Sequence, residues 1–208
     1  MNPVIDAIKT RRSVRSYKAD PVSKDVIETL IEAGNWAPTG ANFQPWRFVV
    51  ITDPDFRQKL LEAARPGYRE SIRGFLNAQG HLREHAGEML QRCLGWTSET
   101  YEALIYRLLE TEDGVYYAAP VIIFVIGAPP ITVDADCAMV CQNMMLAAHS
   151  LGLGSCWVGF GSNIKHDPEI VAALELEDKE RIYGPIIVGY PEIFPEPPPK
   201  KEPRVKWI

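Results

Sequence analysis

The 208-residue chain lacks the features that place a protein in a membrane or outside the cell. Its longest apolar run, "AAPVIIFVIGAPP" at residues 118–130, is too short to span a bilayer and is closed by prolines. The first residues, "MNPVIDAIKTRRSVR", show no secretory signal pattern, because they are amphipathic and soon charged. We therefore expect a soluble cytoplasmic protein without a membrane partner.

An excess of positive charge is also missing. The 22 lysines and arginines are outnumbered by 27 aspartates and glutamates, which gives a formal net charge of −5. Neutralising nucleic-acid phosphates needs a basic face, so this balance argues against a nucleic-acid partner. The hydrophobic content of 46% is ordinary for a globular protein, and the length suits a single domain over residues 1–208.

Cysteine is scarce, and its spacing matches neither a disulfide framework nor a metal site. Cys137 and Cys141 are four residues apart on one predicted helix, and neither a CxxC pair nor a matching histidine spacing accompanies them. We expect buried, reduced thiols and no metal.

The order of the predicted elements indicates an α+β fold. Asn2 and Pro3 are typical of the start of a helix, and Ser23 precedes a second helix that should stop at Gly34 and Asn35. Further helices are expected from residue 53 and over residues 134–154 and 167–176, and strands over residues 47–53, 119–130, 155–160 and 183–191.

Two segments depart from this compact pattern. The sequence of residues 66–114 predicts a helical, charged and aromatic excursion without a clear strand. Its candidates for stacking a flat substrate are Tyr68, Phe75, Trp96, Tyr101 and Tyr106, although aromatics at helical spacing are more often core residues. Residues 191–208 form a proline-rich arm that excludes helix, yet it ends in the hydrophobic "RVKWI", which suggests that the arm reaches another surface.

Positive charge gathers at the predicted end of the first helix, in Arg11, Arg12 and Arg15 with Ser13 between them. Cations at a helix C-terminus complement its dipole, which explains one or two of them. The forked guanidinium group is equally suited to a phosphate, and both interpretations stay open.

A second basic patch lies on the arm and consists of Lys200, Lys201 and Arg204. A solvated tail is the simpler interpretation. Alternatively, the two basic clusters meet on one phosphate dianion. The sequence has no GxGxxG or GxxxxGK[ST] loop, so side chains must hold any such phosphate.

Two other segments resemble ligand-binding loops in composition. Residues 36–51, "WAPTGANFQPWRFVVI", place the amides Asn42 and Gln44 just ahead of a strand. The glycines of "LGLGSCWVGFG" at residues 151–161 allow backbone to approach a flat ligand, although a turn with a β-bulge explains them equally well. No catalytic acid, base or nucleophile is identified, which favours chemistry by a bound cofactor.

Together these segments resemble the FMN-dependent nitroreductase family. The matching motifs are "RRSVRSY", "APTGANFQPWRFVVI", "DCAMVCQNMMLAAHSLGLGSCWVGF" and "YGPIIVGYP" followed by the basic tail. The resemblance covers the chain except for about residues 66–114, which it identifies as a variable helical lid. It implies a three-layer α+β fold with a central mixed, mainly antiparallel sheet flanked by helices, in a domain-swapped homodimer with FMN at the interface.

The resemblance also implies a role for each matching residue. Arg11, Arg12 and Ser13 match the phosphate-binding run, and Arg15 matches a basic residue near the flavin ring. Pro38, Thr39, Asn42 and Gln44 match the loop that reaches the flavin of the other subunit. Val158, Gly159 and Phe160 match the backbone strip beside the N5 and O4 edge of the ring. Lys200 and Lys201 match the tail cations that close on the phosphate, with Arg204 as a competitor.

The implied activity is electron transfer from NADH or NADPH, through bound FMN, to a nitroaromatic, a quinone or a similar conjugated acceptor. Gly40 and Gly159 depart from residues common in the family, and Gly159 puts the nitroreductase substrate preference in question. Two alternatives stay open. One is a specialised member that destroys flavin or performs reductive dehalogenation, and the other is a flavin-binding protein without turnover.

Overall fold

The structure is a computed structural model, and it describes residues 2–77, 112–129, 131–197 and 200–208. These residues belong to two compact units, Met1–Tyr68 with Asp113–Pro195 and Arg69–Glu112 with Glu196–Ile208. Most of the predicted excursion, including Cys93, Trp96, Tyr101 and Tyr106, lies outside the described residues. The lid and the single-domain organisation therefore stay predictions.

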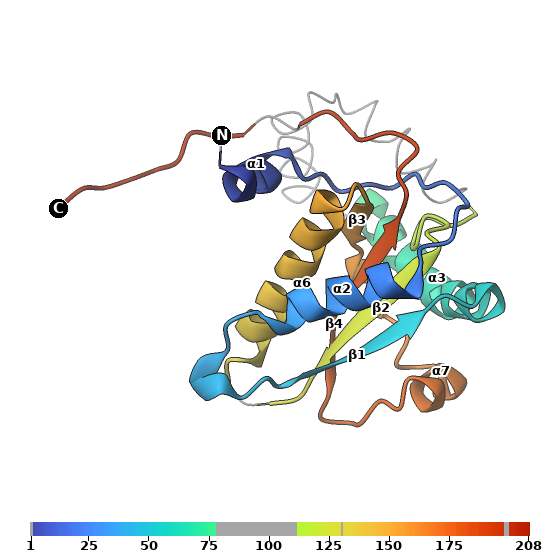
Figure 1. The fold of residues 1–208 in the computed structure, drawn as a ribbon. Helices are drawn as coiled ribbons and strands as arrows, with labels where there is room; N and C mark the ends of the chain where they lie inside the picture. The colour runs from blue at the N-terminus through green and yellow to red at the C-terminus, as the bar shows by residue number, and fades with distance from the viewer. Residues whose placement is uncertain (1, 78–111, 130, 198–199) are drawn as a thin grey trace. The chain divides into compact units, whose positions relative to one another are not determined.

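The first unit is built on a four-stranded sheet (Figure 1). The strands are β1 (Trp46–Ile51), β2 (Val121–Gly127), β3 (Gly154–Trp157) and β4 (Arg181–Gly189). Their order is β1-β2-β4-β3, and each neighbouring pair is antiparallel. One parallel bridge, between Ser13 and Ser155, adds the N-terminal segment beside β3. The expected α+β fold with a mainly antiparallel sheet is confirmed.

The helices begin and end close to their sequence signals. They are α1 (Pro3–Thr10), α2 (Lys24–Asn35), α3 (Pro54–Asn77), α6 (Val133–Ser150) and α7 (Pro168–Ala173), with short 3₁₀ helices η1 (Gly40–Asn42) and η2 (Gly159–Ser162). The Asn2 side chain accepts a bond of 2.9 Å from the Val4 N–H, as a helix N-cap does. Within the described part of the chain, no helix combines the length and hydrophobicity needed to cross a bilayer.

Helix α6 lies at the centre of one hydrophobic layer. It packs against α2 on one side and against β2, β3 and β4 on the other (Figure 1). Val140 and Met144 of α6 are buried together with Leu30 of α2 and Ile123 of β2. On the other face of the sheet, where Figure 1 shows α3 and α7, Phe124 is fully buried. The core thus forms on both faces of β2, in agreement with its continuous apolar sequence.

Two boundaries differ from the sequence prediction. Helix α3 continues through Pro66 to Asn77 as one helix, although Pro66 has no N–H to donate. The strand predicted over residues 155–160 ends at Trp157, and the chain turns into η2. In β4, the register against β2 shifts around Pro185, because proline cannot donate to the ladder of a central strand.

The bridge beside β3 requires glycine at position 154. A Cβ atom there would lie 2.8 Å from Cβ, Cγ1 and Cγ2 of Val14, whose side chain is fully buried. We expect Gly154→Ala to lower the free energy of unfolding by about 1–3 kcal/mol, because Val14 cannot move without opening the core. Chemical denaturation measures this change.

The matched control is Gly74→Ala in α3, where an added Cβ meets no atom within 4 Å. Alanine is a better helix former by about 1 kcal/mol, so this variant should be as stable as the native chain or more stable. Equal effects of the two substitutions would contradict the packing argument.

Candidate functional site

The predicted phosphate-binding run follows α1 directly. Arg11 is the C-cap of α1, and its N–H donates to the Ala7 carbonyl at 3.0 Å. Ser13 then forms the parallel bridge with Ser155, and the Val14 N–H donates to the Ser155 carbonyl at 3.0 Å. The run is therefore fixed to the edge of the sheet at β3.

Arg12 uses part of its guanidinium group to cap the helix. Its Nη1 donates to the carbonyls of Lys9 and Arg11, each at 2.8 Å. Arg12 thus contacts the C-terminal end of α1, which is in line with the interpretation of a cation that complements the helix dipole. This interpretation does not account for the whole cluster, because other polar atoms of the run are left without such bonds.

Four buried polar atoms at this junction have no hydrogen-bond partner among the described residues: Arg11 Nε, Arg12 Nε, His149 Nδ1 and Ser155 Oγ. They come from the basic run, from the end of α6 and from β3. A buried polar atom without a partner is costly, so a group of them on one junction indicates a place that a ligand completes. His149 and Ser155 were missed in the sequence, where they lie inside apolar motifs.

Arg15 lies against a strained turn. Its Cζ is 5.8 Å from the centroid of the Tyr117 ring, a distance at which a cation and a ring attract each other. Tyr117 has a φ of 55°, which is unusual for a bulky residue. The Asp113 carboxylate holds this turn by accepting from the N–H groups of Tyr116 and Ala118 at 2.7 and 2.8 Å. Strain of this kind is typical of functional sites.

The same turn positions the segment Val158, Gly159 and Phe160. The Tyr116 hydroxyl donates to the Gly161 carbonyl at 2.9 Å, next to this segment. The Val158 N–H donates to the Pro185 carbonyl at 3.0 Å, so it already has an acceptor within the protein. Gly159 and Phe160 open η2, where N–H groups have no acceptor within the helix. Gly159 has no side chain and is exposed, so its backbone can be approached by a flat ligand.

The loop that includes Pro38 is anchored at the other end of α6. The Thr39 hydroxyl donates to Asp136 Oδ2 at 3.1 Å, and Asp136 is only 2% exposed. The Gln44 N–H donates to Thr39 Oγ1 at 3.3 Å. Asn42 and Gln44 both have positive φ values, 58° and 47°, and both are exposed. The anchor residue Asp136 was not predicted, because its role depends on a contact across 97 residues.

The loop and the basic run are too far apart to meet within one chain. The loop bonds to Asp136 near the start of α6, while Thr10 at the end of α1 bonds to His149 in its last turn. At about 1.5 Å per residue, the helix between positions 136 and 149 is about 20 Å long. Figure 1 shows the two segments at opposite ends of α6. The predicted site residues thus form two groups.

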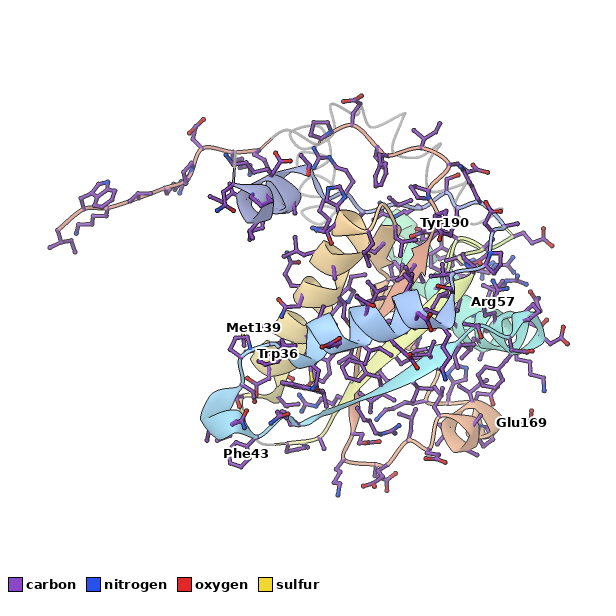
Figure 2. The ribbon with its side chains drawn as sticks, in the orientation of Figure 1. Trp36, Phe43, Arg57, Met139, Glu169 and Tyr190 are labelled. Atoms are coloured by element: carbon purple, nitrogen blue, oxygen red, sulfur yellow. The ribbon has the colours of Figure 1, made fainter. Side chains whose placement is uncertain are left out.

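Trp36 and Phe43 extend from the loop region (Figure 2) and are 79% and 63% exposed. Lys200 and Lys201 belong to the second unit, where they are exposed and lie outside helices and strands. Their predicted place on a phosphate stays a prediction.

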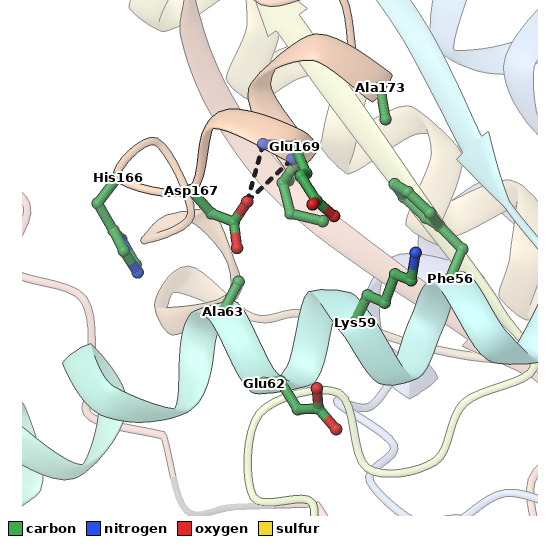
Figure 3. Close-up of a pocket in the computed structure, with 9 residues that line it drawn as sticks. Phe56, Lys59, Glu62, Ala63, His166, Asp167, Glu169 and Ala173 are labelled. Carbon is green, nitrogen blue, oxygen red and sulfur yellow. Dashed lines mark hydrogen bonds between the residues drawn. The ribbon is translucent and has the colours of Figure 1, made fainter.

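A separate cavity lies between α3 and α7 (Figure 3). It has a volume of about 550 Å³, and its lining includes Phe56, Lys59 and His166. Asp167 also lines it and caps α7 by accepting from the Glu169 N–H at 2.9 Å. None of the predicted site residues lines this cavity.

The buried cysteines are inert in this environment. Burial raises the pKa of Cys137 and of Cys141 to about 12 each, so both are thiols at neutral pH. Within the described residues, no group of three histidine, cysteine or acidic side chains is arranged to hold a metal ion.

Comparison with known proteins assigns the chain to a family. The sequence model of the Nitroreductase family matches residues 8–190. The chain belongs to the nitroreductase family. A solved structure of a nitroreductase with bound FMN, from Bacteroides fragilis, is 29% identical with a TM-score of 0.66, and the match covers 99% of this chain and 96% of that one. The resemblance to the nitroreductase family that the sequence motifs indicate is confirmed.

Two further relatives of this nitroreductase family member match shorter regions. A Methanothermobacter thermautotrophicus protein, provisionally named NADH dehydrogenase/NAD(P)H nitroreductase, is 26% identical over 156 residues. That match covers 75% of this chain and 60% of the relative, so the chain spans less than two thirds of its length. Iodotyrosine deiodinase 1 of Rattus norvegicus is 42% identical over 57 residues, which are 27% of this chain and 20% of that protein.

The loop of this nitroreductase family member should depend on its threonine anchor. Thr39→Val keeps the shape of the side chain and removes both hydrogen bonds of its hydroxyl. We expect faster amide hydrogen exchange over residues 38–44 and a loss of about 1 kcal/mol in the free energy of unfolding. Exchange mass spectrometry and denaturation measure the two effects.

Thr29→Val is the matched control, because the Thr29 hydroxyl donates only within α2, to the Asp25 carbonyl at 2.9 Å. It should leave exchange in the loop unchanged. Unaltered exchange over residues 38–44 in Thr39→Val would show that the loop is held by other contacts.

Proposed function

We propose that the chain is an FMN-dependent oxidoreductase that acts as a homodimer. It takes electrons from NADH or NADPH and passes them to a nitroaromatic, a quinone or a similar conjugated acceptor. The observation that carries the proposal is the group of unpartnered buried atoms around Arg11, Arg12 and Ser155. It lies in a chain of this family, and a solved relative at 29% identity holds FMN.

The residues at the junction fit the phosphate group of FMN. A phosphate dianion loses its hydration on binding, and guanidinium groups offset that cost with charge-assisted hydrogen bonds. Arg11 and Arg12 would supply the charges and Ser13 a hydroxyl. Ser155, with its unpartnered Oγ, would add a second hydroxyl. Lys200 and Lys201 of the arm would add two more cations, with Arg204 as the alternative.

Bound FMN would supply the redox chemistry, accepting a hydride from the nicotinamide and passing electrons to the acceptor. The role of the protein is to bind and to orient. Arg15, held by Tyr117, would place a positive charge where the reduced ring carries negative charge, which favours reduction. The N–H groups of Gly159 and Phe160 would hold the edge of the ring. We assign no catalytic side chain, in agreement with the absence of such a motif from the sequence.

The separation of the two groups of site residues supports the homodimer. Pro38, Thr39, Asn42 and Gln44 lie at one end of α6 and the basic run at the other, so they can serve one flavin only if two copies contribute. The apolar side chains of α1 also support a homodimer, since Val4 is 63% and Ile8 is 53% exposed. Exposed apolar side chains grouped on one helix are typical of an interaction surface.

Reductive dehalogenation is a second candidate reaction. It is favoured by the local similarity to iodotyrosine deiodinase, which reaches 42% identity but spans 27% of the chain. The same cofactor site serves both reactions, because the phosphate and ring contacts do not involve the acceptor. The acceptor pocket therefore determines whether the protein reduces a conjugated acceptor or removes a halogen. It also determines whether the protein turns over at all or only binds flavin.

The purified protein should be yellow, and NADH or NADPH should bleach it under anaerobic conditions. Adding an acceptor should restore the colour, which absorbance spectroscopy follows directly. A panel of nitroaromatics, quinones and halogenated phenols identifies the class that reoxidises the protein fastest. The protein should also sediment as a dimer with one FMN per chain.

A yellow protein that neither nicotinamide donor bleaches would favour a flavin-binding protein without turnover. A colourless protein that FMN does not reconstitute would exclude the enzyme and the binding protein alike. Fast reoxidation by halogenated phenols alone would favour dehalogenation.

The phosphate assignment has its own test. Arg12→Ala combined with Lys201→Ala should weaken FMN binding about 100-fold, since each charged hydrogen bond contributes about 1.5 kcal/mol. Fluorescence titration of the flavin measures the affinity. The control pair Lys24→Ala and Lys179→Ala removes two exposed cations and should leave the affinity unchanged. Equal affinity in both pairs would show the phosphate assignment to be wrong.

A further inference from the structure

The hydrogen bonds around His149 fix which of its nitrogens carries a proton. The Thr10 hydroxyl donates to the Asp6 carbonyl at 2.8 Å, and a hydroxyl has only one hydrogen to donate. Thr10 Oγ1 also lies 2.8 Å from His149 Nε2, so in that contact the hydroxyl accepts and Nε2 donates. Neutral His149 therefore has its proton on Nε2, and Nδ1 carries a bare lone pair.

That lone pair is buried and has no hydrogen-bond partner among the described residues. The ring packs edge-on against Phe194, with 5.7 Å between centroids. The charged groups that act on it are Arg11, Arg12 and Asp6. Burial first, and then the two arginines, lower the pKa of His149, while Asp6 raises it by less. His149 is thus neutral at pH 7 in the free protein, beside two permanent cations.

We propose that His149 takes up a proton from solvent at Nδ1 when the flavin phosphate binds beside Arg11 and Arg12. The imidazolium is then an additional cationic ligand, and it is charged only in the occupied site. This inference rests on the proposed function, because it needs a phosphate at the junction. It extends that function by coupling FMN binding to proton uptake.

The sign of the pH dependence follows from the change in charge. A phosphate dianion offsets the repulsion from Arg11 and Arg12 and favours protonated His149, so binding raises its pKa. Between the free and the bound pKa, binding takes up a proton, and the affinity rises as the pH falls. Below about pH 6 the phosphate itself becomes protonated, which opposes this trend. The proton uptake is therefore measured above about pH 6.5, where the phosphate is mostly a dianion.

The test is calorimetric titration of the full-length, flavin-free protein in two phosphate-free buffers with different ionisation enthalpies. The difference in heat gives the number of protons taken up per ligand. At pH 7.5 we expect an uptake of roughly half a proton or more with FMN. We expect none with riboflavin, which has the same ring and no phosphate.

His149→Gln is the matched variant, because its amide can still donate to Thr10 but cannot be protonated. It should abolish the proton uptake and weaken FMN binding roughly tenfold, while riboflavin binding stays unchanged. If this variant fails to fold, the comparison of FMN with riboflavin on the native chain remains decisive.

FMN binding without proton uptake in the native chain would overturn the role of His149 and leave the proposed function intact. Equal uptake in the native chain and in His149→Gln would overturn it as well. Failure of both FMN and riboflavin to bind would overturn the inference together with the proposed function.

Discussion

The constraint on which the site depends is the attachment of the N-terminal segment to β3. The Val14 N–H donates to the Ser155 carbonyl, and the buried Val14 side chain packs where Gly154 leaves room for it. This contact brings Arg11 and Arg12 to the last turn of α6. The negative end of a helix dipole stabilises cations there, which partly offsets the cost of gathering them. The remaining cost falls on the buried polar atoms Arg11 Nε, Arg12 Nε, His149 Nδ1 and Ser155 Oγ, which have no hydrogen-bond partner among the described residues.

Helix α6 then determines how the site is divided. Its first turns anchor the loop through Asp136, and its last turn contacts α1 through His149. An α-helix cannot be shortened without losing its core contacts, so the separation of the two groups is fixed by Met144 and its neighbours. The homodimer we propose is the arrangement that lets both groups serve one ligand. Exposed Trp36 and Phe43 are in keeping with such a surface.

The sequence predicted the parts of the structure that local signals control. Asn2 caps α1 as expected, and the continuous apolar run of β2 is buried throughout. The helix through Pro66 was not predicted, because the local penalty of proline is outweighed by the burial of α3 side chains such as Leu61 and Tyr68 on either side of it. Asp136 and His149 were missed for a related reason. Their functions come from contacts with segments far away in the sequence, and no spacing rule describes such contacts.

Protonation of His149 links the stability of the free protein to the chemistry of its ligand. The pKa of His149 is lowered in the folded chain, so its contribution to stability is present above the unfolded pKa and is lost as the pH falls through the folded value. A permanent cation at this position would repel Arg11 and Arg12 whenever the site is empty. A neutral ring avoids that repulsion in the free chain and supplies a charge only when the phosphate arrives. A titratable residue therefore fits this position better than a further arginine, which is always charged.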